Sequence, residues 1–266
     1  MLNSFLFAGG GTGGHLTPGL AVAAELSRRD PTCRIVFVGT DRPLESRILA
    51  GTGYEHRALP VESARVLLRK PWRFFWRNYQ AFRLARSVLD EVRPVGVIGL
   101  GGFASVPTVW HATQRRIPTV LLEGNAIPGR ANRLLCRRAQ AVCAATSGLE
   151  QRLPAAAHVC ETGNPLRPQF ADLWAQAEHV QNVGPHTLLV LGGSLGAEGL
   201  NRAVVDVISR RRSELAGWRI VHQTGAAHFE ETARSYAAAG IVADVQPFFD
   251  DLPRHYGSAT LAVTRA

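Results

Sequence analysis

The residues of this chain best suited to chemistry are one histidine and the glycines around it. His15 lies in segment 8–19, AGGGTGGHLTPG, between a short apolar run and a helix-like run. Glycine N–H groups can approach an anion closely because no side chain is in the way. A following helix adds its positive N-terminal end, and imidazole can take up a proton near neutral pH. The segment therefore predicts a phosphate-binding loop with a proton acceptor beside it.

Three interpretations of this loop remain open on its spacing alone. Gly9, Gly11 and Gly14 match the G-x-G-x-x-G fingerprint of dinucleotide binding. The acidic residue that should end the second strand, however, comes only later, as Asp41. Binding of another diphosphate is therefore favoured over NAD, and a purely structural turn is the third alternative. Thr17 and Pro18 suit an N-cap and a first helical turn, so we expect the helix to begin there.

Similar turns follow other apolar runs of the chain. The segment 192–197, GGSLGA, is a second glycine-rich turn, and Gly101-Gly102 is a shorter one. Glu123 and Asn125 end a further run, and they suit either a turn cap or ligand contacts. The carboxyl ends of parallel strands meet at one edge of a sheet, and ligands bind there. We therefore expect these turns to form the binding edges of the fold.

Short apolar runs alternate with helical patterns along the whole chain, which indicates parallel sheets covered on both faces. The proline-rich segment 163–168 interrupts the alternation, which starts again at residue 187. We expect an α/β protein of two facing doubly wound domains, 1–165 and 185–266, with a linker at 166–184. The second domain is expected to be incomplete. Expected strands are 2–7, 34–38, 95–100, 118–123, 141–145, 158–162, 187–191, 219–223, 242–248 and 260–263. Expected helices include 18–28, 42–50, 106–113, 131–139, 200–210 and 226–239.

Segment 65–89 differs in character, because arginines alternate there with aromatic residues such as Trp72, Phe75 and Trp76. A helix lying on an anionic membrane would place such rings at the headgroup level. A surface for single-stranded nucleic acid would stack bases on them. An ordinary helix would bury the rings and leave its arginines in water. The sequence leaves these three alternatives open.

Composition favours acidic partners and gives no sign of a metal centre. The 266 residues have a formal net charge of +9, and Lys70 is the only lysine among 30 basic residues. Nucleic acid, anionic lipid and phosphorylated substrates all suit this charge. The four cysteines lack the spacing of a zinc or redox motif. Without a signal-like start or a membrane-spanning run, a cytoplasmic protein is expected.

Taken together, these motifs resemble the MurG family, the N-acetylglucosaminyltransferases of peptidoglycan synthesis. The resemblance implies a GT-B fold and an inverting transfer of N-acetylglucosamine from UDP-N-acetylglucosamine. The acceptor would be lipid I, undecaprenyl-diphosphoryl-N-acetylmuramoyl-pentapeptide, at the cytoplasmic face of the inner membrane, where the enzyme would be peripheral. It implies neither a metal nor another cofactor, and no nucleic-acid partner. The motifs are Gly10–His15 with Pro18-Gly19, Gly101-Gly102, Glu123-Gly124-Asn125, residues 163–167 and residues 192–197.

The resemblance also implies roles for individual residues. His15 would be the base, and Glu123 would act on the acceptor or orient its neighbours. Trp72, Phe75 and Trp76 would belong to the membrane-associating region. The donor would be bound by Thr12, Gly13, Gly14, Asn125, Arg167, Ser194 and the backbone of Phe249. The acceptor diphosphate would be bound by Gly11, Gly101, Gly102 and Asn132.

This chain departs from the family pattern at several positions. Leu122 and Gly124 stand where the family usually has histidine and glutamine, and Phe103 stands where an aromatic with a hydroxyl is common. Residues 264–266 match only the opening of a motif whose remainder binds ribose, so a C-terminally truncated member is expected. Two alternatives remain: a non-catalytic module that binds the lipid acceptor, and a GT-B enzyme with a different donor or acceptor.

Overall fold

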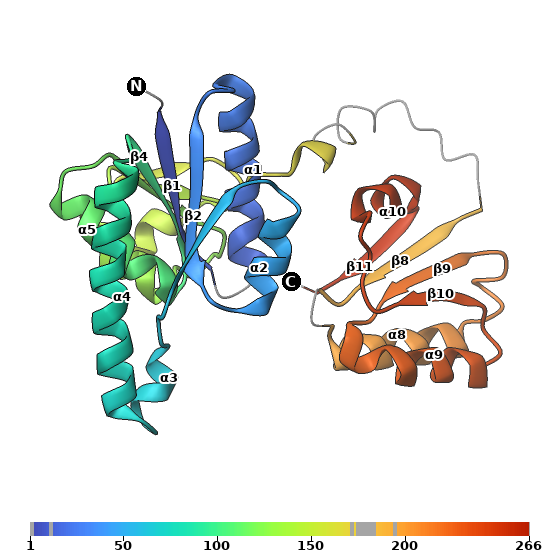
Figure 1. The fold of residues 1–266 in the computed structure, drawn as a ribbon. Helices are drawn as coiled ribbons and strands as arrows, with labels where there is room; N and C mark the ends of the chain where they lie inside the picture. The colour runs from blue at the N-terminus through green and yellow to red at the C-terminus, as the bar shows by residue number, and fades with distance from the viewer. Residues whose placement is uncertain (1–2, 11–12, 171–172, 174–184, 194–195, 266) are drawn as a thin grey trace. The chain divides into compact units, whose positions relative to one another are not determined.

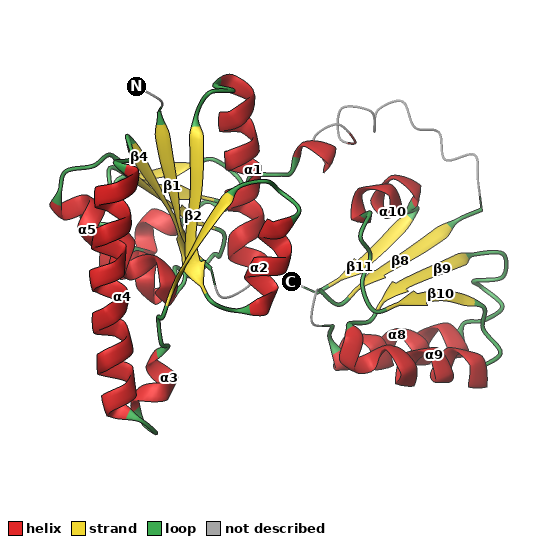
Figure 2. Ribbon diagram, viewed as in Figure 1, coloured by secondary structure: helices red, strands yellow, loops and turns green. Residues whose placement is uncertain are grey.

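The computed structural model describes residues 3–10, 13–170, 173, 185–193 and 196–265. The chain divides into two compact units, residues 1–168 and 169–266, and each is considered by itself. Each unit contains one parallel sheet with helices on its faces (Figures 1 and 2), which confirms the expected α/β class. Most of the expected linker, 166–184, lies outside the described residues. No helix among those described is both long and apolar enough to cross a bilayer.

The sheet of the first unit has seven parallel strands in the order β3-β2-β1-β4-β5-β6-β7. Leu6 of β1 pairs with Val36 of β2 on one side and with Val97 of β4 on the other. The strands are β1 (Ser4–Gly9), β2 (Arg34–Thr40), β3 (Glu55–Leu59), β4 (Gly96–Gly101), β5 (Thr119–Glu123), β6 (Ala141–Ala144) and β7 (Val159–Glu161). The helices are α1 (Gly13–Arg29), α2 (Pro43–Ala50), α3 (Ala64–Leu67), α4 (Pro71–Val92), α5 (Val106–Gln114) and α6 (Arg130–Leu135).

Alternating strand residues supply two separate cores, because successive side chains point to opposite faces of a sheet. Phe7 and Phe37 stack with ring centroids 4.9 Å apart, and they share a core with buried residues of α1 and α2. Leu6 and Val36 point to the other face, where α4 and α5 cover them. Figure 1 shows the two helix pairs, α1 with α2 and α4 with α5, on opposite sides of the sheet.

Helix α1 begins earlier than predicted. The expected start at Thr17 and Pro18 is wrong, because the helix starts at Gly13 and Pro18 lies inside it. Proline has no N–H, so the bond to the Gly14 carbonyl is missing, and this loss is tolerated near a helix start. His15 therefore lies in the first turn of α1 rather than in a loop.

A fully buried carboxylate, that of Glu45 on α2, lies under the first glycine-rich segment. It accepts hydrogen bonds from the backbone N–H (2.8 Å) and the hydroxyl of Thr40, at the end of β2. A Cβ atom on Gly10 or on Gly39 would collide with this carboxylate. Gly10 is therefore required for packing against Glu45, whatever ligand the segment binds.

The second unit has a four-stranded parallel sheet in the order β10-β9-β8-β11. Leu188, Val190 and Ile220 pack against α8 and α9, while Leu189 and Val221 share a core with Phe249 on the other face. The elements are β8 (Thr187–Leu191), α8 (Glu198–Arg210), β9 (Arg219–Gln223), α9 (Phe229–Ala238), β10 (Ala243–Gln246), α10 (Leu252–Ser258) and β11 (Leu261–Thr264).

A chain of hydrogen bonds in the core of this unit joins β9 to both covering helices. The side-chain amide of Asn201 donates to the Thr224 carbonyl (3.0 Å), so its oxygen accepts from Nε2 of His222 (3.1 Å). Nδ1 of His222 is then left to accept from the Tyr236 hydroxyl (3.0 Å). In these directions the chain uses a neutral imidazole and a neutral phenol. Burial lowers the pKa of His222 from 6.5 to about 4 and raises the pKa of Tyr236.

Removing the charge of Glu45 is expected to destabilise the first unit. Glutamine at this position has one acceptor oxygen instead of two, so the N–H and the hydroxyl of Thr40 can no longer each donate to a separate oxygen. We expect Glu45→Gln to lower the free energy of unfolding by about 1–3 kcal/mol in urea titrations. Glu25→Gln is the matched control, because Glu25 is an exposed glutamate on α1 whose ion pairs with Arg28 and Arg29 are also exposed. An unchanged midpoint in Glu45→Gln would show that the loop does not depend on this carboxylate.

The buried His222 is expected to make stability fall in acid. The pKa of His222 is about 4 in the folded protein, and the reference value of 6.5 applies to the unfolded chain. Below pH 6.5 the unfolded chain therefore binds a proton that the folded protein does not. Stability from this group is complete above pH 6.5 and is lost as the pH falls toward 4. Between pH 7 and 5 we expect a loss of about 2 kcal/mol in wild type that His222→Gln does not show. Urea unfolding of both proteins at the two pH values tests this, and an equal loss in both would assign it to other groups.

Candidate functional site

The first unit has a polar pocket at the carboxyl edge of its sheet. Its wall comes from the start of α1, the ends of β4, β5 and β6, and the segment after β7. Sequence-predicted residues therefore meet here although they are far apart in the chain. The pocket is lined by Gly14, His15, Pro18, Leu100, Leu122, Glu123, Gly124, Asn125, Cys143, Ala145, Gly163, Asn164 and Pro165.

The imidazole of His15 lies against the backbone of Gly101 and Gly102. A Cβ atom on Gly101 would be 3.4 Å from Nδ1 of His15, and one on Gly102 would be 3.7 Å from Nε2. Both glycines have positive φ, +84° and +72°, and a Cβ on Gly102 would also come within 2.9 Å of the Gly10 carbonyl. Any other residue would therefore have a strained backbone at either position, and its Cβ would be in van der Waals contact with the ring. Among the described residues the His15 side chain has no hydrogen-bond partner, so its ring nitrogens remain available to a ligand of the pocket.

Glu123, at the end of β5, is 4% exposed and has all of its hydrogen bonds within the protein. One oxygen accepts from the backbone and side-chain amides of Asn125 (3.0 and 2.9 Å). The other accepts from the backbone of Gly129 (2.8 Å) and the side chain of Asn132 (3.0 Å). Four donors saturate the carboxylate, so it orients the 124–129 segment and the two asparagines.

Asn132, on α6, extends this arrangement toward His15. Its amide nitrogen also donates to the Leu122 carbonyl (2.9 Å), while its buried side-chain oxygen has no hydrogen-bond partner among the described residues. A Cβ on Gly101 would be 3.5 Å from the Asn132 amide. Gly101 is thus flanked by His15 and Asn132, and Asn132 lies in a position that supports the Gly101–Gly102 turn.

The second unit contains the other glycine-rich turn. Gly193 and Gly196 have positive φ, +82° and +80°, and a Cβ on Gly196 would collide with the Thr224 carbonyl. Phe249 is buried, its ring lies 4.0 Å from that of His255, and its N–H donates to the side chain of Gln223. The N–H of Phe249 is therefore already bonded within the protein. Sequence reasoning treated Gln223 only as the last residue of a strand and so missed it.

Some predicted site residues are not part of either arrangement. Arg167 is half-buried in the segment after β7, within the first unit. Gly11, Thr12 and Ser194 lie outside the described residues, and Gly13 begins α1. No cluster of histidine, cysteine, aspartate and glutamate that could hold a metal ion occurs among the residues described.

The N-terminal half of α4 presents its aromatic residues to solvent. Trp72 is 87% exposed, and Phe75 and Trp76 are each 61% exposed. The interpretation of these rings as ordinary core residues is therefore wrong. The buried residues of α4 lie in its C-terminal half, from Ala81 to Val92, so only that half packs on the sheet.

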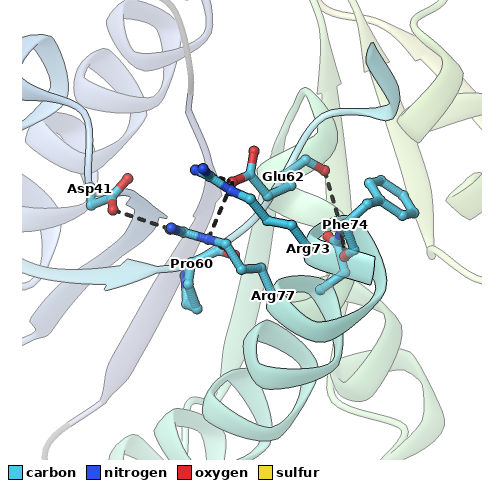
Figure 3. A network of polar contacts seen from close by, with 7 residues as sticks. Asp41, Pro60, Glu62, Arg73, Phe74 and Arg77 are labelled. Carbon is cyan, nitrogen blue, oxygen red and sulfur yellow. Dashed lines mark hydrogen bonds and ion pairs between the residues drawn. The ribbon is translucent and has the colours of Figure 1, made fainter. Parts of the chain in front are cut away.

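Glu62 fixes the N-terminal half of α4. Its carboxylate pairs with Arg73 (2.8 Å) and with Arg77 (3.3 Å), and Arg77 also reaches Asp41 (3.4 Å). Asn78 donates to the Glu62 backbone carbonyl (3.2 Å). Figure 3 shows Glu62 joined to both guanidinium groups, and Asp41 on the other side of the Arg77 guanidinium. These two arginines are thereby neutralised, whereas no ion pair among the described residues involves Arg69, Lys70, Arg83 or Arg86.

Comparisons with known proteins agree with this architecture. Residues 5–144 match the glycosyltransferase family 28 N-terminal domain, and residues 187–266 match its C-terminal domain. Among solved structures, MurG of Acinetobacter baumannii has a TM-score of 0.70 and 28% identity, covering 99% of this chain and 72% of that one. A UDP-GlcNAc 2-epimerase from Neisseria meningitidis, solved with UDP-GlcNAc bound, has a TM-score of 0.67, covering 100% of this chain and 78% of its own. At 13% identity it shows the fold alone.

Two similar curated proteins bear the same name. The transferase from Pelobacter propionicus is 37% identical over 98% of this chain and 74% of its own length. The one from Geobacter sulfurreducens is 37% identical over 98% of this chain and 72% of its own length. Both are named UDP-N-acetylglucosamine–N-acetylmuramyl-(pentapeptide) pyrophosphoryl-undecaprenol N-acetylglucosamine transferase. The chain therefore has the GT-B fold of family 28 glycosyltransferases, and it belongs to the MurG family of N-acetylglucosaminyltransferases.

Proposed function

We propose that this chain transfers N-acetylglucosamine from UDP-N-acetylglucosamine to the C4 hydroxyl of N-acetylmuramic acid in lipid I, which forms lipid II. The observation that supports this most is the 37% identity to the Pelobacter propionicus transferase over 98% of the chain. The pocket beside His15 adds a physical reason, because it offers an imidazole and several polar groups at one sheet edge.

His15 is the proposed base of the reaction. As the sugar hydroxyl attacks the anomeric carbon of the donor, its proton passes to a neutral imidazole nitrogen. The bond to UDP breaks at the same carbon, and negative charge develops on the leaving diphosphate. Glycine-turn N–H groups and helix N-termini stabilise such charge. The turn after β8, with Ser194 and Arg167, is proposed for this task, and Phe249 is proposed to contact uracil.

Glu123 is proposed as a positioning residue rather than as an acid or base. Its two oxygens already accept four hydrogen bonds, so proton transfer would first require breaking them. Through those bonds it orients Asn125, proposed to contact the donor, and Asn132, which lies beside the Gly101–Gly102 turn. Gly11, Gly101 and Gly102 are proposed to approach the acceptor diphosphate, while Thr12, Gly13 and Gly14 are proposed on the donor side.

The exposed half of α4 is proposed to dock on the anionic cytoplasmic surface of the inner membrane. Exposed tryptophan and phenylalanine rings partition to the headgroup region, and unpaired cations nearby attract anionic lipid. Those cations are Arg69, Lys70, Arg83 and Arg86. Arg73 and Arg77 are not counted among them, because Glu62 and Asp41 neutralise their charges. A protein bound to this membrane surface would meet its lipid-linked acceptor there.

A transfer assay tests the proposed reaction. Purified chain is incubated with radiolabelled UDP-N-acetylglucosamine and lipid I in detergent, and lipid-linked label is measured. UDP-glucose and UDP-N-acetylgalactosamine serve as competing donors. Absence of transfer with all three would overturn the proposal in favour of a non-catalytic module, and preference for another sugar would favour the alternative donor.

Replacing His15 by alanine is expected to lower kcat by about 10²–10⁴-fold, the usual contribution of a general base. Donor binding should change far less, because the base meets the acceptor hydroxyl. Steady-state kinetics and titration with UDP separate the two effects. His158→Ala is the control, since His158 is exposed and does not line the pocket. An unchanged kcat in His15→Ala would remove His15 from the base role.

Replacing Trp72, Phe75 and Trp76 together by serine is expected to weaken binding to vesicles containing phosphatidylglycerol by at least about tenfold. The melting temperature should stay close to that of wild type, because these rings are exposed. Vesicle co-sedimentation and thermal unfolding measure the two quantities. Val207→Ser with Val242→Ser is the control, as both valines are exposed in the second unit. Retained vesicle binding by the triple variant would refute this membrane face.

A further inference from the structure

A buried glutamine in the second unit joins two loops to which the proposed function gives different tasks. Gln223 ends β9 and is 4% exposed. Its side-chain NH₂ donates to the Gly193 carbonyl (3.1 Å), in the turn after β8. Its side-chain oxygen accepts from the N–H of Phe249 (2.9 Å), in the loop after β10. One planar amide therefore sets the separation between two backbone segments.

Burial makes this bridge specific. An amide that lost either partner here would leave a buried donor or acceptor unpaired, which is more costly than losing a hydrogen bond exposed to water. The amide plane also fixes direction, because only its nitrogen donates and only its oxygen accepts. Leucine or methionine at position 223 would fill the space without holding either loop.

The next residue of the chain supports the same turn at its other end. A Cβ on Gly196 would collide with the Thr224 carbonyl, so the turn packs directly on Thr224. The Asn201 amide holds that carbonyl (3.0 Å). Gln223 thus contacts the turn at Gly193 and Thr224 contacts it at Gly196, so these consecutive residues support its two ends.

We propose that Gln223 is a positioning residue for the nucleoside diphosphate, which holds the phosphate-binding turn at a set distance from the Phe249 peptide. This inference rests on the proposed function, in which the turn meets the diphosphate and Phe249 meets uracil. A ligand with both groups joined through ribose requires both loops at one separation. Gln223 touches neither group itself and acts through the two backbone segments.

The test compares Gln223→Met with Gln246→Met. Methionine has nearly the length of glutamine and cannot form either bond. The Gln246 side chain is exposed and bonds only Asp244 among the described residues (3.2 Å), so its replacement is the matched control. Hydrogen–deuterium exchange of the Phe249 amide reports on the bridge without any ligand. Titration with UDP, together with KM and kcat for UDP-N-acetylglucosamine, reports its consequence.

In Gln223→Met we expect faster exchange at Phe249 and about a tenfold rise in the UDP Kd and the donor KM. The kcat at saturating donor and the KM for the lipid acceptor should stay within about twofold of wild type. The reason is that the Gln223 bridge does not position the acceptor or the base. Gln246→Met should match wild type throughout. A further variant, Gln223→Glu, keeps an acceptor for the Phe249 amide and should retain slow exchange there, while losing the bond to Gly193.

The inference would be overturned by unchanged exchange at Phe249 in Gln223→Met, or by faster exchange with an unchanged UDP Kd. A uniform fall in kcat for all substrates, with a lowered melting temperature, would also overturn it by showing a general structural role. Failure of the proposed function is distinguishable, because wild type itself would then not bind UDP or UDP-N-acetylglucosamine.

Discussion

The hydrogen bonds to one buried carboxylate, that of Glu123, determine the shape of the candidate site in the first unit. Four N–H groups converge on it, and no water is needed to satisfy it. A carboxylate removed from solvent is stable only with such partners. The segment from Asn125 to Gly129 must therefore fold around the end of β5, and this places Asn125 at the pocket and Asn132 beneath the Gly101–Gly102 turn.

Close backbone approach is the second constraint, and it explains glycines that a ligand alone would not require. Gly10 and Gly39 leave space for the Glu45 carboxylate, and Gly102 leaves space for the Gly10 carbonyl. His15 lies beside the Gly101–Gly102 turn. In the second unit Gly196 packs on Thr224 in the same manner. Both glycine-rich segments thus pack on buried polar residues, Glu45 in one unit and the consecutive Gln223 and Thr224 in the other.

Much of the fold follows from the sequence pattern, and the misses have physical reasons. The apolar runs at β1, β2, β4 and β8 are buried at every residue or at all but one, and β5 alternates buried with half-buried residues, so their composition marks them as strands. Strand β3, EHRAL, was missed because it is an edge strand with few apolar residues. The start of α1 was placed too late because proline favours first turns, yet the helix here includes Pro18 in its second turn. Helix α10 is short and half-polar, so no periodicity marked it.

The sequence by itself determined the class of fold, the family and some of the residues gathered at the first pocket, among them His15, Glu123 and Asn125. These depend on motifs and apolar runs, which are local properties of the chain. Only the tertiary structure decided what several of those residues do. It showed that Glu123 is saturated by four donors, that Trp72 and Trp76 face solvent, and that Gln223 joins two loops. The physical reason is that hydrogen-bond saturation and burial depend on partners far away in sequence, and no local pattern contains them.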